Sequence, residues 1–124
     1  TGVAHGAPEQ LTVQGRTLAV PEAARGVARF GFAALCEAAL GPADYLALAR
    51  QYETVFVAGV PVFDAASRNA AKRFITLIDT LYDARRRVVI TAAAAPGALY
   101  PGVEEFRRTA SRLEEMQAAD WWAT

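Results

Sequence analysis

The feature that most constrains the fold is a pair of β-prone runs with a helical segment between them. The run TVFVAGVPVF at 54–63 is β-branched and aromatic, and Pro61 closes its strand. A second run, RVVITAA at 87–93, follows a segment from about Ala66 to Arg86 that carries the period of a helix. A connection of this length between two apolar strands favours a right-handed crossover and parallel pairing. The sequence therefore predicts a strand, helix, strand unit.

The intervening helix is predicted to pack on the sheet by one broad face. At about 100° per residue, its large apolar side chains share one arc and its polar side chains share the opposite one. The apolar arc comprises Phe74, Ile75, Leu77, Ile78, Leu81 and Tyr82, and the polar arc comprises Lys72, Arg73, Thr76, Asp79, Thr80 and Asp83. Asp79 and Asp83 have the spacing of a magnesium or acid–base pair, but a mixed-charge face is usually solvated, and we favour the solvated interpretation.

The amino-terminal part is predicted to add a β-hairpin to this unit. Residues 1–9 are small and offer little to bury, so we expect a flexible leader or linker remnant before one α/β domain at 10–124. Two short β-prone runs flank Gln14 and Gly15, which is a hairpin signal. Pro21 is expected to end the second run.

A third strand, two short helices and a carboxy-terminal helix complete the prediction. VARFGF at 27–32 reads as a strand, and AALCEAAL at 33–40 reads as a short helix stopped by Gly41. Pro42 suits the first turn of the next helix, and a last helix is expected in FRRTASRLEEMQAADWW at 106–122. The predicted class is α/β, with a β-hairpin followed by a small, mainly parallel sheet packed by helices.

The composition excludes several classes of function. Thirteen basic and thirteen acidic residues cancel, so the long-range field that attracts nucleic-acid phosphates is absent and no nucleic-acid partner is expected. One cysteine, Cys36, and one histidine, His5, cannot form an internal disulfide or a structural zinc site of Cys and His ligands, so we expect no metal site. No apolar run approaches the roughly 20 residues that span a bilayer, and no transmembrane segment is expected.

Single reactive side chains give no enzyme site. A phosphate-binding loop needs a glycine-rich turn followed by Lys and Ser or Thr, and Lys72 instead follows RNAA inside a predicted helix. Cys36 lies in an apolar stretch beside an acid, so packing is favoured over nucleophilic chemistry. His5 has no Ser or Cys partner in the leader, and Asp44 is expected to cap the helix that it opens.

Arg108 and Arg112 are the candidate catalytic residues. Arginines four apart on a helix present two planar forks on one side, which can clamp a phosphate or the carboxylate of a partner. The alternative is an ordinary surface salt bridge between Arg112 and Glu115, worth about 0.3 to 0.5 kcal/mol. From spacing alone the structural interpretation is favoured.

Three aromatic residues are candidates for partner binding. Trp121 and Trp122 close the predicted carboxy-terminal helix, and Tyr100 lies in the loop AAAPGALYPG. Interfaces are enriched in tryptophan, although both tryptophans are equally compatible with packing inside the parent protein.

Four segments, in order, resemble the carboxy-terminal third of the ZapE cell-division ATPases, also called the AFG-one-like or lactation-elevated family. They are FGFAALCEAALGPADYLALARQYETVFVAGVPVF, AKRFITLIDTLYDARRRVVITAA, LYPG and FRRTASRLEEMQ, and the similarity runs from about Leu11 to Trp122. In that family a preceding segment carries the Walker A and Walker B motifs, to which nothing here corresponds. The family pattern reads RRFI where this chain has Lys72 and Arg73 before Phe74, and the link between LYPG and FRRT is shorter here.

The resemblance implies a nucleotide-driven hydrolase that uses ATP and magnesium and acts in cell division or membrane-protein quality control. This chain would be its accessory part, packing on the nucleotide-binding segment of the same protein and coupling ATP state to other subunits or a division-ring protein. It would need no cofactor and hydrolyse no ATP by itself. The resemblance also implies a bacterial cytoplasmic location, at most peripheral at the inner face of the membrane.

Two other functions remain open at this stage. The first is a protein-interaction module that recruits a division or membrane-associated partner without contacting nucleotide. The second is a free-standing enzyme, which is disfavoured because the sequence shows no nucleophile, metal cluster or convincing acid–base pair.

Overall fold

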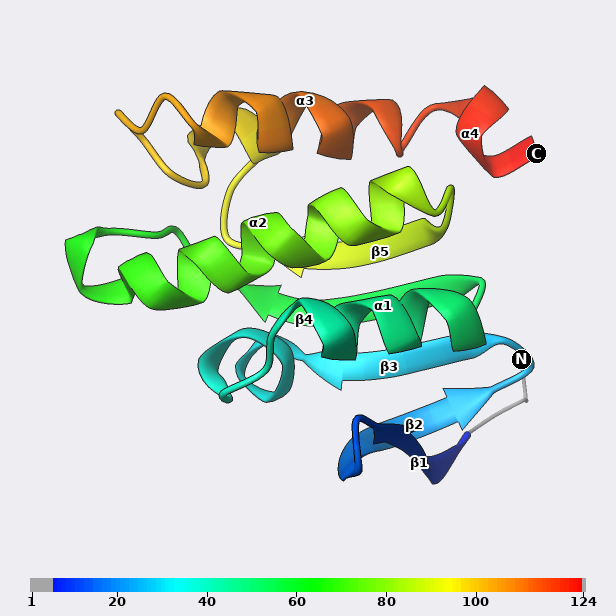
Figure 1. The fold of residues 1–124 in the computed structure, drawn as a ribbon. Helices are drawn as coiled ribbons and strands as arrows, with labels where there is room; N and C mark the ends of the chain where they lie inside the picture. The colour runs from blue at the N-terminus through cyan, green and yellow to red at the C-terminus, as the bar shows by residue number, and fades with distance from the viewer. Residues whose placement is uncertain (1–5, 124) are drawn as a thin grey trace.

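Five strands form a single sheet in the order β1-β2-β3-β4-β5 (Figure 1) in a computed structural model that describes residues 6–123. Neighbours in the sheet are also neighbours in sequence. The strands are β1 (Ala7–Val13), β2 (Arg16–Ala24), β3 (Val27–Gly31), β4 (Thr54–Val60) and β5 (Arg87–Ala92). The first three alternate in direction, whereas β3, β4 and β5 run parallel. The predicted α/β class, with a hairpin followed by parallel strands, is confirmed.

The first hairpin turns at the predicted residues. Gln14 and Gly15 both have positive φ, of 51° and 79°, which is the backbone conformation of the tight turns that suit the twist of a hairpin. Glycine adopts this conformation without strain, and Gln14 tolerates it at the tip.

The second strand is longer than predicted, because Pro21 does not end it. β2 continues to Ala24, and its register with β1 shifts next to the proline, between the pairs Glu9↔Val20 and Ala7↔Ala23. A proline, which has no N–H to donate, is tolerated in a strand at such an irregularity. β1 itself begins at Ala7, inside the range expected to be a leader; residues 1–5 of that leader, with His5, lie outside the described residues.

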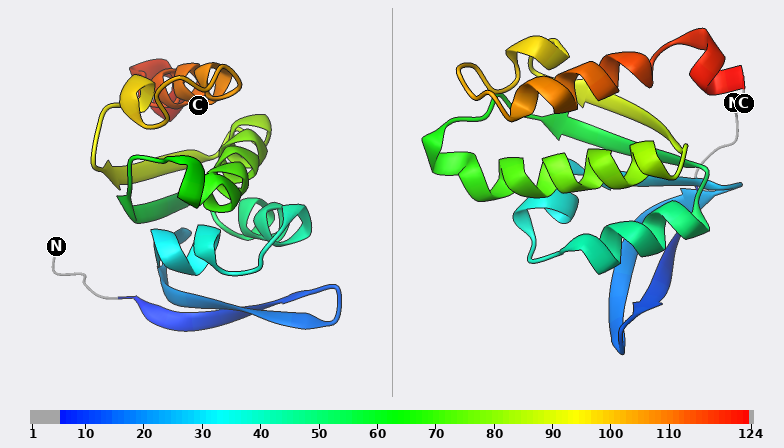
Figure 2. Two further views of the ribbon diagram at one scale, coloured as in Figure 1. Left: turned by 90° about the vertical axis from the view of Figure 1, so that its left-hand side faces the viewer. Right: turned by 45° about the horizontal axis from the view of Figure 1, so that its top comes forward.

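Helices form the second layer, on one face of the sheet (Figure 2). α1 (Pro42–Gln51) and α2 (Arg68–Asp83) lie side by side on this face, and α3 (Phe106–Glu115) packs on the far side of α2. A short α4 (Ala119–Ala123) follows. Three short helical turns complete the chain: η1 (Ala33–Glu37), η2 (Ala65–Ser67) and η3 (Pro96–Ala98).

The topology explains why both crossover helices share a face. The chain passes from β3 to β4 through η1 and α1, and from β4 to β5 through η2 and α2. Each crossover moves one strand further in the same direction. Two crossovers of the same hand that progress in one direction place their helices on the same side of a sheet.

An aromatic cluster centres the core between the parallel strands and the helices. Phe63, which follows β4, lies 5.6 to 6.0 Å between ring centroids from Phe32, Phe74, Tyr100 and Phe106. The predicted apolar arc of α2 faces this core: Phe74, Leu77, Ile78 and Leu81 are fully buried, and Ile75 and Tyr82 are half-buried.

Three predicted helices have different bounds in the structure. The expected helix at 33–40 is only the π-helical turn η1. α2 begins after η2, which is capped by the preceding Asp64, whose side chain accepts from the Ala66 and Ser67 amides. The expected continuous helix at 106–122 breaks after Glu115. There the amides of Gln117 and Ala118 bond three residues back, a tighter turn that starts α4 in a new direction.

Candidate functional site

Arg108 and Arg112 meet on one carboxylate of the neighbouring helix. Arg112 Nη1 lies 2.6 Å from Asp79 Oδ1, and Arg108 Nη2 lies 3.3 Å from Asp79 Oδ2. The side chain of Arg112 is 23% exposed and that of Arg108 is 68% exposed. Asp79 therefore joins α2 to α3, which corrects its predicted role as a purely solvated residue.

The predicted alternative, a salt bridge between Arg112 and Glu115, is wrong. Glu115 accepts a hydrogen bond from the Tyr82 hydroxyl at 2.7 Å, and the Arg112 guanidinium lies over the Tyr82 ring, 4.6 Å from its centroid. The hydrogen bond to Glu115 raises the pKa of Tyr82 above 10.0. Arg112 is thus held by a carboxylate and a ring at once.

Helix packing explains this arrangement. Phe106, Ala110 and Leu113 bury one face of α3, so Arg108 and Arg112 emerge beside that face, toward α2. The sequence pattern predicted both arginines as site residues but did not identify the carboxylate that pairs with them. Asp79 was detectable only as a member of the polar arc, because its partners lie 29 and 33 residues away.

A shallow hollow of about 490 Å³ opens over this cluster. It is lined by Tyr82, Glu104, Arg107, Arg108, Ser111, Arg112 and Glu115. Most of the Arg108 side chain is exposed, so its guanidinium can reach an incoming phosphate or carboxylate. The Arg112 guanidinium is instead paired closely with Asp79. Chemically, the arrangement can bind an anion; nothing in it resembles a nucleophile with its base.

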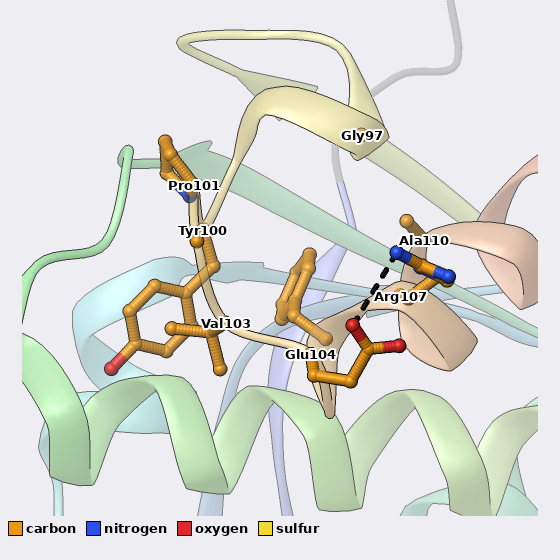
Figure 3. A pocket seen from close by; sticks show the side chains of 9 residues that line it. Gly97, Tyr100, Pro101, Val103, Glu104, Arg107 and Ala110 are labelled. Carbon is orange, nitrogen blue, oxygen red and sulfur yellow. Dashed lines mark ion pairs between the residues drawn. The ribbon is translucent and has the colours of Figure 1, made fainter.

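A second cavity, of about 300 Å³, lies between the η3 loop and α3 (Figure 3). Tyr100, Pro101 and Val103 line it from the loop and Arg107 from α3, and Arg107 Nη2 pairs with Glu104 Oε1 at 3.3 Å. Both ends of this ion pair are about four-fifths exposed, so it contributes little to stability. Tyr100, a predicted partner-binding candidate, is half-buried in this wall. The cavity was not predicted. Its only sequence signal is the prolines and glycines of the loop.

The two tryptophans differ in accessibility. Trp121 is 4% exposed, stacks on Tyr82 and Arg85, and donates from Nε1 to the Arg86 carbonyl at 2.9 Å. Its indole is therefore built into this fold and does not form a surface anchor. Trp122 is 36% exposed and remains a candidate for partner contact.

Asp44 caps α1, as predicted, and has a partner that the sequence did not reveal. Its Oδ2 accepts from the Gly41 amide at 2.8 Å. Its Oδ1 lies 2.9 Å from Arg16 Nη2, an ion pair with no accompanying hydrogen bond. Asp44 is 1% exposed, so the tip of the first hairpin is tied to a buried carboxylate.

Cys36, Lys72 and Asp83 add no reactive group to these hollows. Cys36 is fully buried, and burial raises the pKa of its thiol from 9.0 to about 12, which confirms a packing role. Lys72 and Asp83 are exposed on α2. Within residues 6–123, no group of three His, Cys, Asp or Glu side chains is placed to hold a metal ion, and no helix is long and apolar enough to cross a membrane.

Known proteins resemble this chain over nearly its whole length. The family model described as AFG1-like ATPase matches residues 3–124. Lactation elevated protein 1 homolog B of Danio rerio is 33% identical, over 93% of this chain and 30% of the relative. Cell division protein ZapE of Escherichia coli K12 is 34% identical, over 90% of this chain and 28% of the relative. No solved structure matches.

These matches cover only part of each relative, since the chain spans less than a third of their length. The match of the family model over almost every residue is nevertheless sufficient for assignment. The chain belongs to the AFG1-like ATPase family.

Proposed function

We propose that this chain is an accessory region of an AFG1-like ATPase, which packs on the nucleotide-binding part of the same protein and couples its ATP state to other subunits or a partner. The observation that carries the proposal is the family match over residues 3–124 in a chain without a phosphate-binding loop. ATP and magnesium would be held by the nucleotide-binding part, and this region would contribute contacts.

Arg108 is the residue through which the region would act on nucleotide. Its guanidinium is mostly exposed above the hollow, and Asp79 holds it at only one nitrogen. Arg112, with its short contact to Asp79, fixes that carboxylate and so positions Arg108. A guanidinium that is exposed on one side and paired with a carboxylate on the other is suited to stabilising the charge of a transferring phosphoryl group.

The test is ATP turnover by the full-length ATPase that carries this region. Arg108→Ala should lower turnover about 10³-fold, the effect typical of arginines that stabilise phosphoryl transfer. Arg50→Ala is the matched control, since Arg50 is an exposed arginine of α1 that does not line the hollow; turnover should not change. Unchanged turnover in Arg108→Ala would remove the catalytic part of the proposal.

One observation favours the second function, a protein-interaction module for a division or membrane-associated partner. The loop cavity and the half-exposed Trp122 offer aromatic surface that the fold leaves accessible. The E. coli relative is named as a cell division protein, which supports a partner in division.

A further inference from the structure

The parallel part of the sheet has one face that the described residues leave without a helix. α1 and α2 both lie on the other face, as the two views of Figure 2 agree. Parallel sheets in proteins are almost always covered on both faces, because their crossovers bury them in helices. We call the uncovered side of β3, β4 and β5 the open face.

Strand register identifies the side chains of the open face. Arg29, Phe56 and Val89 are register partners across the three strands. Their neighbours Val55 and Val88 are fully buried under the helices, so the alternation of strand side chains places this row on the opposite side. By the same alternation the open face carries Val27, Arg29, Phe56, Ala58, Val89 and Thr91.

The sequences of β4 and β5 have the pattern of strands covered on both sides. β4 contains Val55, Phe56, Val57 and Ala58 in succession, and β5 contains Val88, Val89 and Ile90. Continuous apolar runs are typical of doubly buried strands, whereas a strand with one solvated face alternates. β1 serves as an internal comparison, since its residues 10–13 alternate polar and apolar.

Two arginines, Arg29 and Arg87, lie along the open face beside aromatic rings. The Arg29 guanidinium lies 4.5 Å from the Phe56 ring centroid, and its Nε is 3.8 Å from Glu22 Oε2. At the β5 edge, Arg87 lies 5.3 Å from the ring centroid of Trp122 and donates to the Trp122 carbonyl at 2.8 Å. The half-exposed Trp122 therefore borders the same face. Aromatic residues with arginine around an apolar centre are the composition of a protein interface.

The start of the described chain lies beside this face. The Gly6 amide donates to Glu22 Oε2 at 3.0 Å, and that same oxygen faces Arg29. Gly6, the first residue that the structure describes, therefore lies next to the open face. The relatives contain more than twice as many residues outside the matched region as within it, which is enough chain to cover the sheet.

We infer that the open face of β3, β4 and β5 is the surface on which the nucleotide-binding part of the same ATPase docks. The identity of the occupant rests on the proposed function. The docked surface would be apolar at its centre, over Phe56 and Val89, and would face Arg29 and Arg87 at its borders. Trp122 then acts as a border contact of this interface.

The experiment measures maleimide labelling of two engineered cysteines in the native full-length ATPase, one peptide at a time by mass spectrometry. Ala58→Cys lies on the open face and Ala84→Cys follows α2 in the helical layer; both alanines are exposed in the fold described here. Ala58→Cys should label about tenfold or more slowly than Ala84→Cys, because it reacts only when the interface opens. Thr91→Cys, also exposed on the open face, is a second probe if Ala58→Cys disturbs the fold.

Equal labelling of the open-face and control cysteines would overturn the inference. The occupant is identified by a photoreactive benzoylphenylalanine in place of Phe56, whose crosslinked peptide should come from the nucleotide-binding part of the same polypeptide. A crosslink to a second copy or to another protein would overturn the assignment of the occupant.

ATP turnover measured on the same preparations separates this inference from the proposed function. Protected open-face cysteines in a protein that does not hydrolyse ATP would contradict the proposed function and leave the docking face standing. Equal labelling in a protein whose turnover depends on Arg108 would do the reverse.

Discussion

At the residue scale, Cys36 is a thiol enclosed by the core. It is fully buried, and its pKa is raised. Burial is the largest cause of that shift, and Glu37 adds to it while Arg73 opposes it. Its neighbour Tyr45 is also buried, donates to the Leu35 carbonyl at 2.7 Å, and has a pKa raised mainly by burial.

These shifts predict that stability falls at alkaline pH. A folded pKa above the unfolded value means that the folded state holds the proton more tightly, so stability is complete below pH 9.0 and declines above it. Cys36 should contribute a slope of about 1.4 kcal/mol per pH unit between pH 9.0 and about 12. Urea unfolding at a series of pH values would measure this slope.

Cys36→Ala is the control for the alkaline slope. It should remove the decline that begins at pH 9.0 and leave the later decline, above 10.0, to which Tyr45 contributes. A slope in Cys36→Ala as steep as in the parent protein would contradict the assignment.

At the scale of elements, α4 is held by contacts of its two tryptophans. Trp121 stacks on Tyr82 with 5.1 Å between ring centroids, and its Nε1 donates to the Arg86 carbonyl where α2 ends and β5 begins. Arg87 donates to the Trp122 carbonyl at 2.8 Å. A helix of five residues has no stability of its own, so its position depends on these contacts.

Two substitutions at Trp121 separate packing from hydrogen bonding. Trp121→Phe keeps an aromatic ring and loses the Nε1 donor, and should lower the free energy of unfolding by about 1 kcal/mol. Trp121→Ala removes the ring as well and should cost about 3 kcal/mol or more. Trp122→Ala is the matched control and should cost far less, since Trp122 is 36% exposed. Similar losses at both tryptophans would contradict this account of α4.

The elements themselves were predictable where the period was long and the punctuation clear. α2 has sixteen residues, which is long enough for the helical period of its apolar arc to be recognised. Gln14 with Gly15 marks a turn because few residue pairs readily adopt positive φ at both positions. Element ends and pairings were not predictable in the same way. The continuation of β2 past Pro21 depends on a register shift in a partner strand, and the Asp79 contacts depend on how α3 lies against α2. Both are long-range packing effects that a local pattern does not contain.

At the scale of the whole molecule, one ion pair connects the projecting hairpin to the helical layer. Arg16 lies next to the turn between β1 and β2, and Asp44 opens α1. The carboxylate is almost completely buried, whereas the guanidinium is half exposed. Loss of the arginine would leave a buried charge with only the Gly41 amide as a partner.

Arg16→Ala should therefore destabilise the protein by about 1 to 3 kcal/mol, the cost of an under-satisfied buried acceptor. In Asp44→Asn the further change of Arg16 to Ala should cost much less, because no buried charge remains. A double-mutant cycle by urea unfolding measures this coupling. Additive effects of the two substitutions would contradict a direct interaction.

The order of the strands also bears on how the sheet forms. Each strand pairs only with strands adjacent to it in sequence, so no strand must be inserted between two that are already joined. The antiparallel pairs of β1, β2 and β3 close short turns and form faster than the parallel pairs, which close the longer crossovers through α1 and α2. During synthesis, the emerging chain can lengthen the sheet strand by strand from β1 to β5, with each segment finding its template already in place.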